Sequence, residues 1–133
     1  MTFNQFSSLL VPDFLNDGSG TLSNSFNPLF TFFTYTNDKG TWPGYIVSLR
    51  SNAVSDIKDR VKSSLEASTN IKNLYLTDPG TAVVWKSGSA EGVATRYSTY
   101  SLAGAGLNYG WLNDTLVVST SYAGFQEALK RLK

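Results

Sequence analysis

The chain has 133 residues, a formal net charge of +1, and neither cysteine nor histidine. Its length fits one domain, so we predict a single globular domain over residues 1–133. Charged residues make up 16% of the chain, against roughly 25% in ordinary domains, and no run of like charges occurs. These features argue against a basic nucleic-acid-binding surface, and we expect no nucleic-acid partner.

The absent residue types also argue against an enzyme. Histidine is the commonest general base and the commonest metal ligand, and the chain has none. No stretch approaches the roughly 20 apolar residues that cross a bilayer, so we expect no membrane insertion by this segment. Met1–Phe6 lacks the basic and apolar regions of a signal peptide.

The first residues predict a short N-terminal helix at residues 3–10. Thr2 and Gln5 match a capping box, apolar residues recur on one helical face, and Pro12 ends the pattern. The alternative is a partly apolar arm without regular structure. Residues 13–28 are rich in Asn, Asp, Gly and Ser, which predicts a loop.

This loop invites comparison with a calcium-binding loop. Asp13, Asp17 and Gly18 fall at positions one, five and six of that twelve-residue pattern. Position three is Leu15, however, and position twelve is Asn24, where a bidentate glutamate is required. We therefore reject Asp13 and Asp17 as calcium ligands, and we expect no metal and no cofactor.

Two β-prone runs, Leu29–Tyr35 and Tyr45–Arg50, predict an antiparallel hairpin around the turn Asn37–Gly40. The alternation of apolar and polar residues fails at Phe32–Phe33, which predicts either a bulge or a strand buried on both faces. We expect a strand this aromatic to lie in the middle of the sheet.

A helix is predicted over about residues 53–68, with Ser51 or Asn52 as its cap. Its apolar stripe consists of Val54, Ile57, Val61 and Leu65. Its opposite side carries two ion pairs at i,i+4 spacing, Asp56 with Arg60 and Lys62 with Glu66. We expect these charges to form a solvated face.

Residues 82–87 and 93–101 predict two further strands around a glycine-containing loop. In the second of these strands Arg96, Ser98 and Tyr100 share one face. Because this face holds an arginine and a serine, we expect it to be exposed to water.

The closing hairpin has the clearest turn signal. Asn113–Asp114 fits a two-residue turn, so Leu112 pairs with Thr115. Counting outward places four large residues on one face, which we predict to be the core face: Tyr109, Trp111, Leu116 and Val118. Ser121 then caps a last helix with apolar residues at spacings of three and four, Phe125, Ala128, Leu129 and Leu132.

These elements predict an α+β fold. We expect an antiparallel sheet of about five to six strands, with two amphipathic helices packed on one face and a short N-terminal helix.

The sequence offers no catalytic set of residues. A serine and lysine pair is formally available with Lys58, Lys62 or Lys86, but residue types alone carry little weight. Glu91 and Asp114 are better explained as a loop charge and a turn former than as paired catalytic carboxylates. We predict no catalytic residue.

Surface aromatic residues are the remaining candidates for function. Trp42 stands beside Pro43 in a predicted turn, and Tyr100 shares its strand face with Arg96. Exposed rings beside neutral polar residues suit polysaccharide or peptide recognition. We therefore take Trp42, Tyr100 and Arg96 as candidate ligand-binding residues, and the alternative for each is a core or rim position.

The segment Asn113–Ser121, followed by the helix with Phe125, Ala128 and Leu129, resembles the closing element of a loose group of bacterial proteins of unknown function. That element is found in extracytoplasmic regions of single-pass, membrane-anchored proteins. The strand at residues 44–50 and the helix from about Ala53 to Leu65 are similar to its earlier part. The resemblance implies an extracytoplasmic or cell-surface segment of a longer anchored protein and names no catalytic residue.

We expect a non-catalytic, extracytoplasmic interaction or structural domain. The alternative is a polysaccharide- or peptide-binding module that uses surface aromatics, and a small histidine-free hydrolase is a second alternative. An aromatic groove would favour binding, whereas a buried lysine or carboxylate with a perturbed pKa in a cleft would favour hydrolysis.

Overall fold

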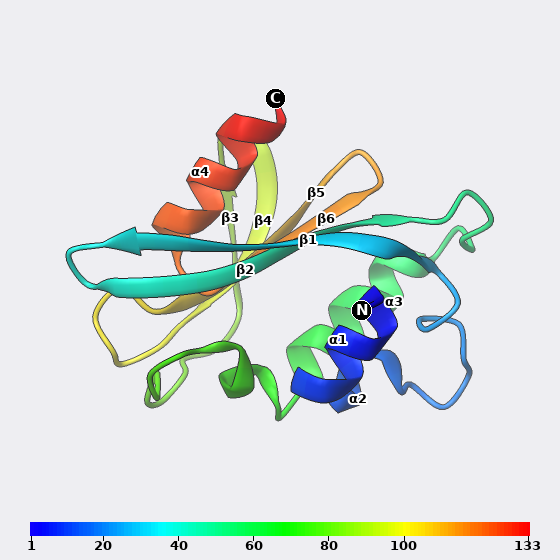
Figure 1. Cartoon of the computed structure of the whole chain (residues 1–133), viewed down its shortest axis with the longest axis horizontal. Coiled ribbons are helices and arrows are strands. Elements are labelled where there is room, and N and C mark those ends of the chain that lie inside the picture. The colour runs from blue at the N-terminus through cyan, green and yellow to red at the C-terminus, as the bar shows by residue number, and fades with distance from the viewer.

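A computed structural model describes all 133 residues as an α+β fold (Figure 1). One open sheet contains six antiparallel strands in the order β1-β2-β6-β5-β4-β3. The strands are β1 (Phe26–Asn37), β2 (Gly40–Leu49), β3 (Lys86–Ala90), β4 (Val93–Thr99), β5 (Gly106–Leu112) and β6 (Thr115–Ser119). The helices are α1 (Phe3–Leu10), α2 (Pro12–Leu15), α3 (Ile57–Ala67) and α4 (Tyr122–Leu132), with a 3₁₀ turn, η1 (Ile71–Leu74). None of the helices combines the length and apolar character needed to span a bilayer.

The hairpin of β5 and β6 has the predicted register. Leu112 lies opposite Thr115, Trp111 opposite Leu116 and Tyr109 opposite Val118. The turn holds because Asn113 adopts a positive φ of 56°, a conformation that asparagine tolerates better than most residues. Sequence spacing and turn chemistry therefore determined this central part of the sheet.

The first hairpin also forms, but β1 lies at the edge of the sheet rather than in its middle. The other side of β2 is occupied by β6, with Tyr45 opposite Val118. The sequence predicted either a bulge at Phe32–Phe33 or burial on both faces, and neither is present: the register shift lies between Phe26 and Phe30, and Phe32 is 50% exposed. Composition made β1 look central because aromatic residues favour strands, but it does not determine strand order.

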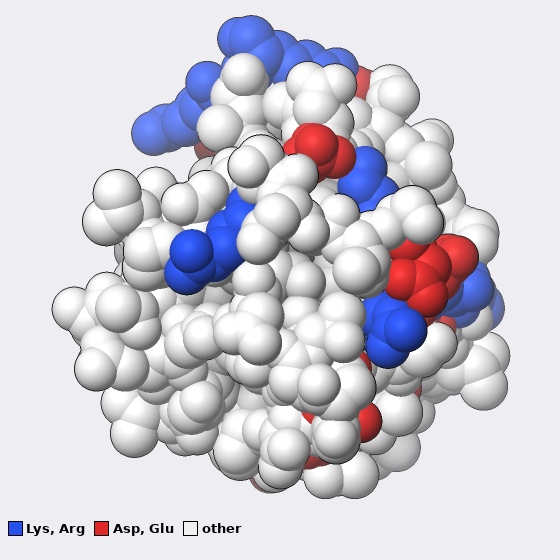
Figure 2. Space-filling view, turned by 90° about the vertical axis from the view of Figure 1, so that its right-hand side faces the viewer, with Lys and Arg blue, Asp and Glu red and all other residues white.

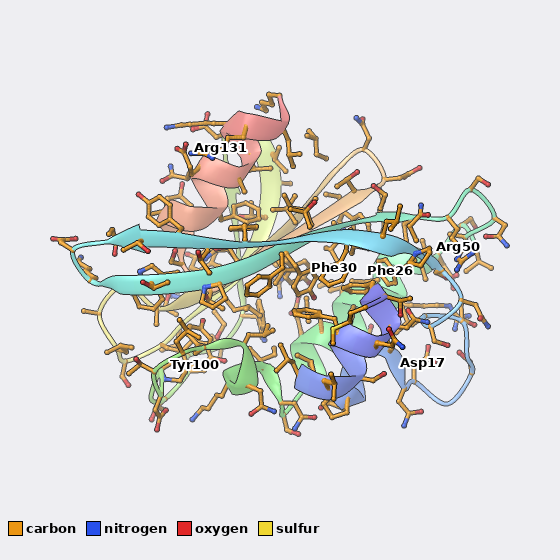
Figure 3. The ribbon with its side chains drawn as sticks, in the orientation of Figure 1. Asp17, Phe26, Phe30, Arg50, Tyr100 and Arg131 are labelled. Carbon is orange, nitrogen blue, oxygen red and sulfur yellow. The ribbon has the colours of Figure 1, made fainter.

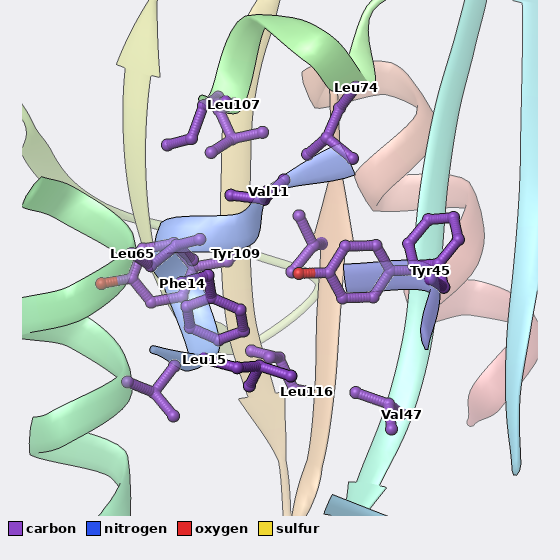
Figure 4. Packing of buried hydrophobic residues seen from close by; sticks show 14 of the residues in the cluster. Val11, Phe14, Leu15, Tyr45, Val47, Leu65, Leu74, Leu107, Tyr109 and Leu116 are labelled. Atoms are coloured by element: carbon purple, nitrogen blue, oxygen red, sulfur yellow. The ribbon is translucent and has the colours of Figure 1, made fainter. Parts of the chain in front are cut away.

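The main hydrophobic core lies between the sheet and the N-terminal helices (Figure 4). Phe14 of α2 and Leu65 of α3 are fully buried there, with Leu116 of β6 beneath them. Helix α1 has the predicted bounds and capping box. Helix α2 lies inside the stretch predicted as a loop, and its buried Phe14 and Leu15 explain why it folds against the core.

Helix α4 covers the other face of the sheet (Figure 1). The structure thus corrects the prediction that both amphipathic helices pack on one face. Val117 points away from Leu116 and Val118, and with Phe125 and Leu129 it forms a second, smaller core. Only Thr120 and Ser121 separate β6 from α4, and the helix folds back over the face that carries Val117.

Close packing of α4 depends on a glycine in β5. A Cβ atom at Gly110 would lie 2.9 Å from the carbonyl oxygen of Ala94 and 3.3 Å from Cζ of Phe125. The missing side chain therefore makes room for the Phe125 ring. Ser121 caps the helix as predicted, since its hydroxyl accepts a hydrogen bond of 3.0 Å from the Gly124 N–H.

Helix α3 is shorter than predicted. It begins at Ile57, and Val54 is exposed instead of joining the apolar stripe. The predicted pair of Asp56 and Arg60 forms, with a nitrogen–oxygen distance of 3.1 Å. Glu66, predicted to pair with Lys62 on the solvated side, instead turns toward the sheet.

Strand β3 begins at Lys86 rather than at residue 82 and is therefore a short edge strand. It joins β4 through the two-residue turn Glu91–Gly92, in which both residues have positive φ values of 51° and 77°. A two-residue turn thus replaces the predicted loop of residues 88–92. Positive φ values at both turn residues are typical of a tight hairpin turn, whose backbone twist matches the twist of the two strands.

Charged side chains are sparse on the molecular surface. The face shown in Figure 2 carries charges of both signs with uncharged surface between them, and basic side chains gather where α4 ends. That end of the chain contains Lys130, Arg131 and Lys133. The arrangement suits the helix, because cations near a helix C-terminus interact favourably with its dipole.

Candidate functional site

A pocket of about 550 Å³ opens on the α4 side of the sheet. It lies over β3, β4 and β5, between the start of α4 and the loop of residues 100–106. Eight of the residues that line it have polar side chains: Ser89, Thr95, Tyr97, Thr99, Tyr100, Ser101, Asn108 and Tyr122. The volume falls within the range of roughly 300 to 1,000 Å³ that is usual for small-molecule sites.

Strand alternation and a glycine on β3 shape this hollow. Thr95, Tyr97 and Thr99 share the face of β4 that points toward α4, but the pocket lies beyond the start of the helix at Tyr122. Thr95 has a glycine opposite it on each neighbouring strand, Gly88 on β3 and Gly110 on β5. Only Gly88 lines the pocket, where a Cβ atom would lie 3.4 Å from Thr95 Oγ1. The space over Gly110 is filled by the Phe125 ring.

Two residues of the pocket floor are almost fully buried in the fold. Thr95 is 5% exposed and Asn108 is 2% exposed. The Asn108 Nδ2 group donates a hydrogen bond of 2.8 Å to the carbonyl oxygen of Gly106, which fixes the amide and leaves its Oδ1 free to accept. Thr95 also lines the pocket, and its hydroxyl forms no hydrogen bond to another side chain or to the backbone. The Asn108 amide is therefore fixed with Oδ1 free to accept, whereas the Thr95 hydroxyl can rotate to donate or to accept.

Tyr122 borders the pocket from the first turn of α4. Its phenol O–H donates a hydrogen bond of 3.3 Å to the carbonyl oxygen of Ser89 on β3. Tyr97 supplies a second ring from β4. No lysine, arginine, aspartate or glutamate lines the pocket, so its chemistry consists of hydroxyls, one amide and aromatic surface.

The structure separates the three residues proposed from sequence. Tyr100 borders the pocket, but its ring packs edge-on against Tyr75 with centroids 5.3 Å apart, and burial raises the pKa of the Tyr100 phenol. Figure 3 shows Tyr100 on the side of the sheet away from α4, whose Arg131 is also labelled. The lining side chains of β4 point to the α4 side, so the Tyr100 ring is not part of the pocket floor.

Trp42 is a core residue rather than an exposed one. It is 3% exposed, and its Nε1 donates a hydrogen bond of 3.0 Å to Oδ1 of Asn37. The turn was expected to expose the indole, but the Tyr75 ring packs edge-on against it. A Cβ at Gly104 would lie 2.9 Å from Cζ2 of Trp42, so the indole also touches the loop that lines the pocket.

Arg96 lies on the opposite face of β4 from the pocket. Its guanidinium binds both carboxylate oxygens of Glu66, at 2.9 and 2.7 Å, and donates a further hydrogen bond to Ser87 Oγ. The face predicted to be exposed is therefore covered by α3, and Ser98 is buried there. The positive charge of Arg96 is thus paired with Glu66, the residue that sequence spacing had paired with Lys62.

The Glu66 cluster does not resemble an acid–base site. Desolvation opposes ionisation of Glu66, but hydrogen bonds from Arg96 and Tyr109 outweigh it and lower the pKa of the carboxyl. Desolvation, together with the hydrogen bond to Glu66, raises the pKa of the Tyr109 phenol. Both donors stabilise the ionised carboxylate, so Glu66 does not readily take up a proton. This behaviour suits a structural role.

The rejected calcium ligands have structural partners. Asp13 accepts hydrogen bonds from Ser68 Oγ at 2.6 Å and from the Thr69 N–H at 2.8 Å, beyond the end of α3. Asp17 accepts from the N–H and hydroxyl of Ser19, and these bonds outweigh desolvation and lower its pKa. No group of three or more acidic side chains is placed to hold a metal ion.

The other catalytic candidates make contacts that do not suit catalysis. Lys58 donates to the carbonyl oxygen of Asn113 at 2.7 Å and lies over the Trp111 ring, not beside a serine hydroxyl. Glu91 is 3.8 Å from Lys130, and Asp114 is 3.5 Å from Lys58, so the two carboxylates serve separate ion pairs.

Comparisons with known proteins add no assignment to this geometry. Searches against protein-family models and curated proteins gave no match. The pocket residues Thr95, Tyr97, Asn108 and Tyr122 were not proposed from sequence. Their only sequence signal is Gly88, which stands opposite Thr95, and it becomes informative once the strand register is known.

Proposed function

We propose that this domain is a non-catalytic binding module that accepts a neutral, hydroxyl-rich ligand, of the carbohydrate class, in the pocket between α4 and β3–β5. One observation carries the proposal: the floor of the pocket presents Oγ1 of Thr95 and Oδ1 of Asn108 from two buried residues, and the Asn108 amide is fixed by its hydrogen bond to Gly106. Preorganised polar groups bind a ligand with little ordering cost.

The lining composition supports a neutral ligand. A charged group entering the pocket would lose water without meeting an opposite charge, which is unfavourable. A sugar hydroxyl, by contrast, both donates and accepts hydrogen bonds, as do the hydroxyls of Thr95, Tyr97 and Thr99. The rings of Tyr97 and Tyr122 offer apolar surface of the kind that packs against sugar C–H groups.

The same composition supports binding without catalysis. The hydroxyls of the pocket have no histidine, carboxylate or lysine beside them to act as a general base. We further propose that the domain works at an extracytoplasmic surface. The low charged fraction and the many serine and threonine residues support that location.

The test is a titration with neutral mono- and oligosaccharides, followed by amide chemical shifts in two-dimensional NMR spectra. We expect saturable shifts for residues 95–108 at millimolar ligand, because a single small pocket supports modest affinity. Fluorescence of Trp42 provides a second signal, since the indole touches Gly104 of the lining loop. Substituting Trp42 itself is unsuitable, because the side chain is buried.

The decisive variant is Thr95→Val, which removes the hydroxyl from the pocket floor and keeps the side-chain shape. Its matched control is Thr34→Val, a strand position outside this pocket. We expect Thr95→Val to weaken binding about tenfold, the loss of roughly one hydrogen bond, with unchanged stability. If only Thr34→Val abolished binding, the ligand site would not be the pocket that Thr95 lines.

A peptide ligand is the competing outcome. If no neutral saccharide shifts residues 95–108 while a short uncharged peptide does, the carbohydrate proposal is overturned and the pocket belongs to peptide recognition. If neither class produces shifts there, the binding-module proposal itself fails.

A further inference from the structure

Strand β1 leaves one long side of the sheet unpaired. It has 12 residues, and its only neighbour in the sheet is β2. Alternate N–H and C=O groups along its outer side therefore lack partners in the sheet, and such an edge is a template for a further strand.

This edge lacks the usual protection over most of its length. No residue in β1 is charged, and Pro28 and the register shift both lie near its N-terminal end, before Phe30. Native edge strands usually carry lysines, prolines or bulges that block pairing. The opposite edge, β3, has only five residues and begins with Lys86, so the two edges differ sharply.

Apolar surface lies on both sides of the β1 edge. On the side of α1, Phe32 is 50% exposed and its ring centroid lies 5.8 Å from that of Phe6. Leu29 of the same strand is 83% exposed. On the side of α4, a groove of about 350 Å³ is lined by Phe33 and Ile46 from the sheet and by Ala128 and Leu132 from the helix. Large exposed apolar residues that gather around a sheet edge are typical of an interaction surface.

We infer that β1 pairs with β1 of a second copy of this chain, antiparallel and about a two-fold axis, to form one continuous sheet of two domains. The strand is suited to itself because it is uncharged, so that no like charges face one another along the seam. Placing Phe33 opposite its copy sets Phe32 opposite Thr34 and Thr31 opposite Tyr35, which are favourable aromatic–threonine pairs.

The charges beside the groove fit the same occupant. Glu127 and Arg131 of α4 line the groove, one of each sign. They form an ion pair with each other within α4, at 3.1 Å. A two-fold axis through the β1 seam brings α4 of both copies to the same face of the joined sheet, and because each pair is already neutralised, no unpaired charge from these residues opposes the approach. A strongly charged partner has no such match on this edge.

This dimer leaves the proposed ligand pocket open. The pocket lies over β3, β4 and β5, at the far side of the sheet from β1. Two pockets would then face the same direction, an arrangement that raises avidity for a repeating ligand. The dimer itself does not rest on that proposed function, and its test uses no ligand.

Analytical ultracentrifugation over a wide concentration range tests the inference directly. We expect the chain to show a concentration-dependent monomer–dimer equilibrium. Phe32→Lys places a charge at the seam, and Val83→Lys is its matched control because Val83 is 51% exposed and lies outside β1. We expect Phe32→Lys to raise the dimer dissociation constant at least about tenfold and Val83→Lys to leave it unchanged.

Two further measurements keep the result interpretable. Phe32 packs near Phe6, with ring centroids 5.8 Å apart, so Thr34→Lys provides a second edge variant at an exposed position. Hydrogen exchange should show added protection of β1 amides in the dimer. A chain that stays monomeric throughout, a dimer that tolerates both edge variants, or protection gained at β3 instead would each overturn the inference.

Discussion

Arg96 on β4 and Glu66 on α3 form a bidentate ion pair, with nitrogen–oxygen distances of 2.9 and 2.7 Å. The Tyr109 hydroxyl donates to the same carboxylate. Residues 30 positions apart in sequence thereby connect the covering helix to two strands. The side chains are 26% and 14% exposed, so solvent screens this pair less than the pairs on the outer surface of α3.

We predict that Arg96→Met lowers the free energy of unfolding by about 1 to 3 kcal/mol, because the Glu66 carboxylate loses its charged partner while partly desolvated. The matched control is Arg60→Met, which removes the exposed pair with Asp56 and should cost at most about 0.5 kcal/mol. Urea unfolding followed by circular dichroism measures both. Equal losses would show that the Glu66 pair is no more than a surface contact.

The same pair makes stability depend on pH. The folded-state pKa of Glu66 is lowered from its ordinary value of 4.5. Its stabilising contribution is therefore present above the unfolded pKa and is lost as the pH falls through the folded pKa. We predict that Glu66→Gln removes part of the acid-dependent loss of stability. Unfolding free energies measured from neutral pH to about pH 3 test this, and identical pH profiles for the variant and the wild type would contradict it.

Close packing at Gly110 provides a third prediction. In Gly110→Ala the new Cβ meets the Ala94 carbonyl oxygen at 2.9 Å, which is backbone and cannot rotate away. We expect a loss of about 1 to 3 kcal/mol, typical of overpacking. Gly106→Ala is the control, because the nearest atom to a Cβ there lies 3.6 Å away, an ordinary contact. Denaturant unfolding compares the two, and a neutral Gly110→Ala would mean that β4 shifts freely.

The cap of α4 provides a fourth prediction. Ser121 is 1% exposed, and its hydroxyl accepts from the Gly124 N–H. Ser121→Ala leaves that donor without a partner and should cost about 0.5 to 2 kcal/mol. Thr2→Ala removes the equivalent bond at the exposed start of α1 and should cost less, because water can replace the hydroxyl. Thermal unfolding of the two variants orders them, and the reverse order would contradict the prediction.

A fifth prediction concerns calcium. Asp13 and Asp17 already accept hydrogen bonds within the protein, and no cluster of three acidic side chains is available. We expect the midpoint of thermal unfolding to be the same with added calcium as with a chelator. Asp13→Ala should cost about 1 kcal/mol through the lost bonds to Ser68 and Thr69. A calcium-dependent rise in the midpoint that disappears in Asp17→Asn would instead indicate a calcium site in this loop.

Local chemistry in the sequence was sufficient for several elements. The Thr2 and Gln5 capping box gave α1, Asn113–Asp114 gave the β5–β6 register, and Ser121 gave the start of α4. Each signal acts over a few neighbouring residues, through a side chain that satisfies a nearby backbone group or tolerates a positive φ. The residues of the segment itself are therefore sufficient to predict such a cap or turn.

Strand order, the faces covered by α3 and α4, and the pocket were decided by tertiary structure alone. The aromatic composition of β1 fits a central or an edge strand equally, and the place of β6 beside β2 settles the matter. Whether Arg96 or Tyr97 faces water depends on which helix covers which side. Trp42 became a core residue, and Thr95 became the floor of a pocket, through partners that stand far away in the chain. Alternation along a strand fixes which residues share a face, but only packing decides which face is buried.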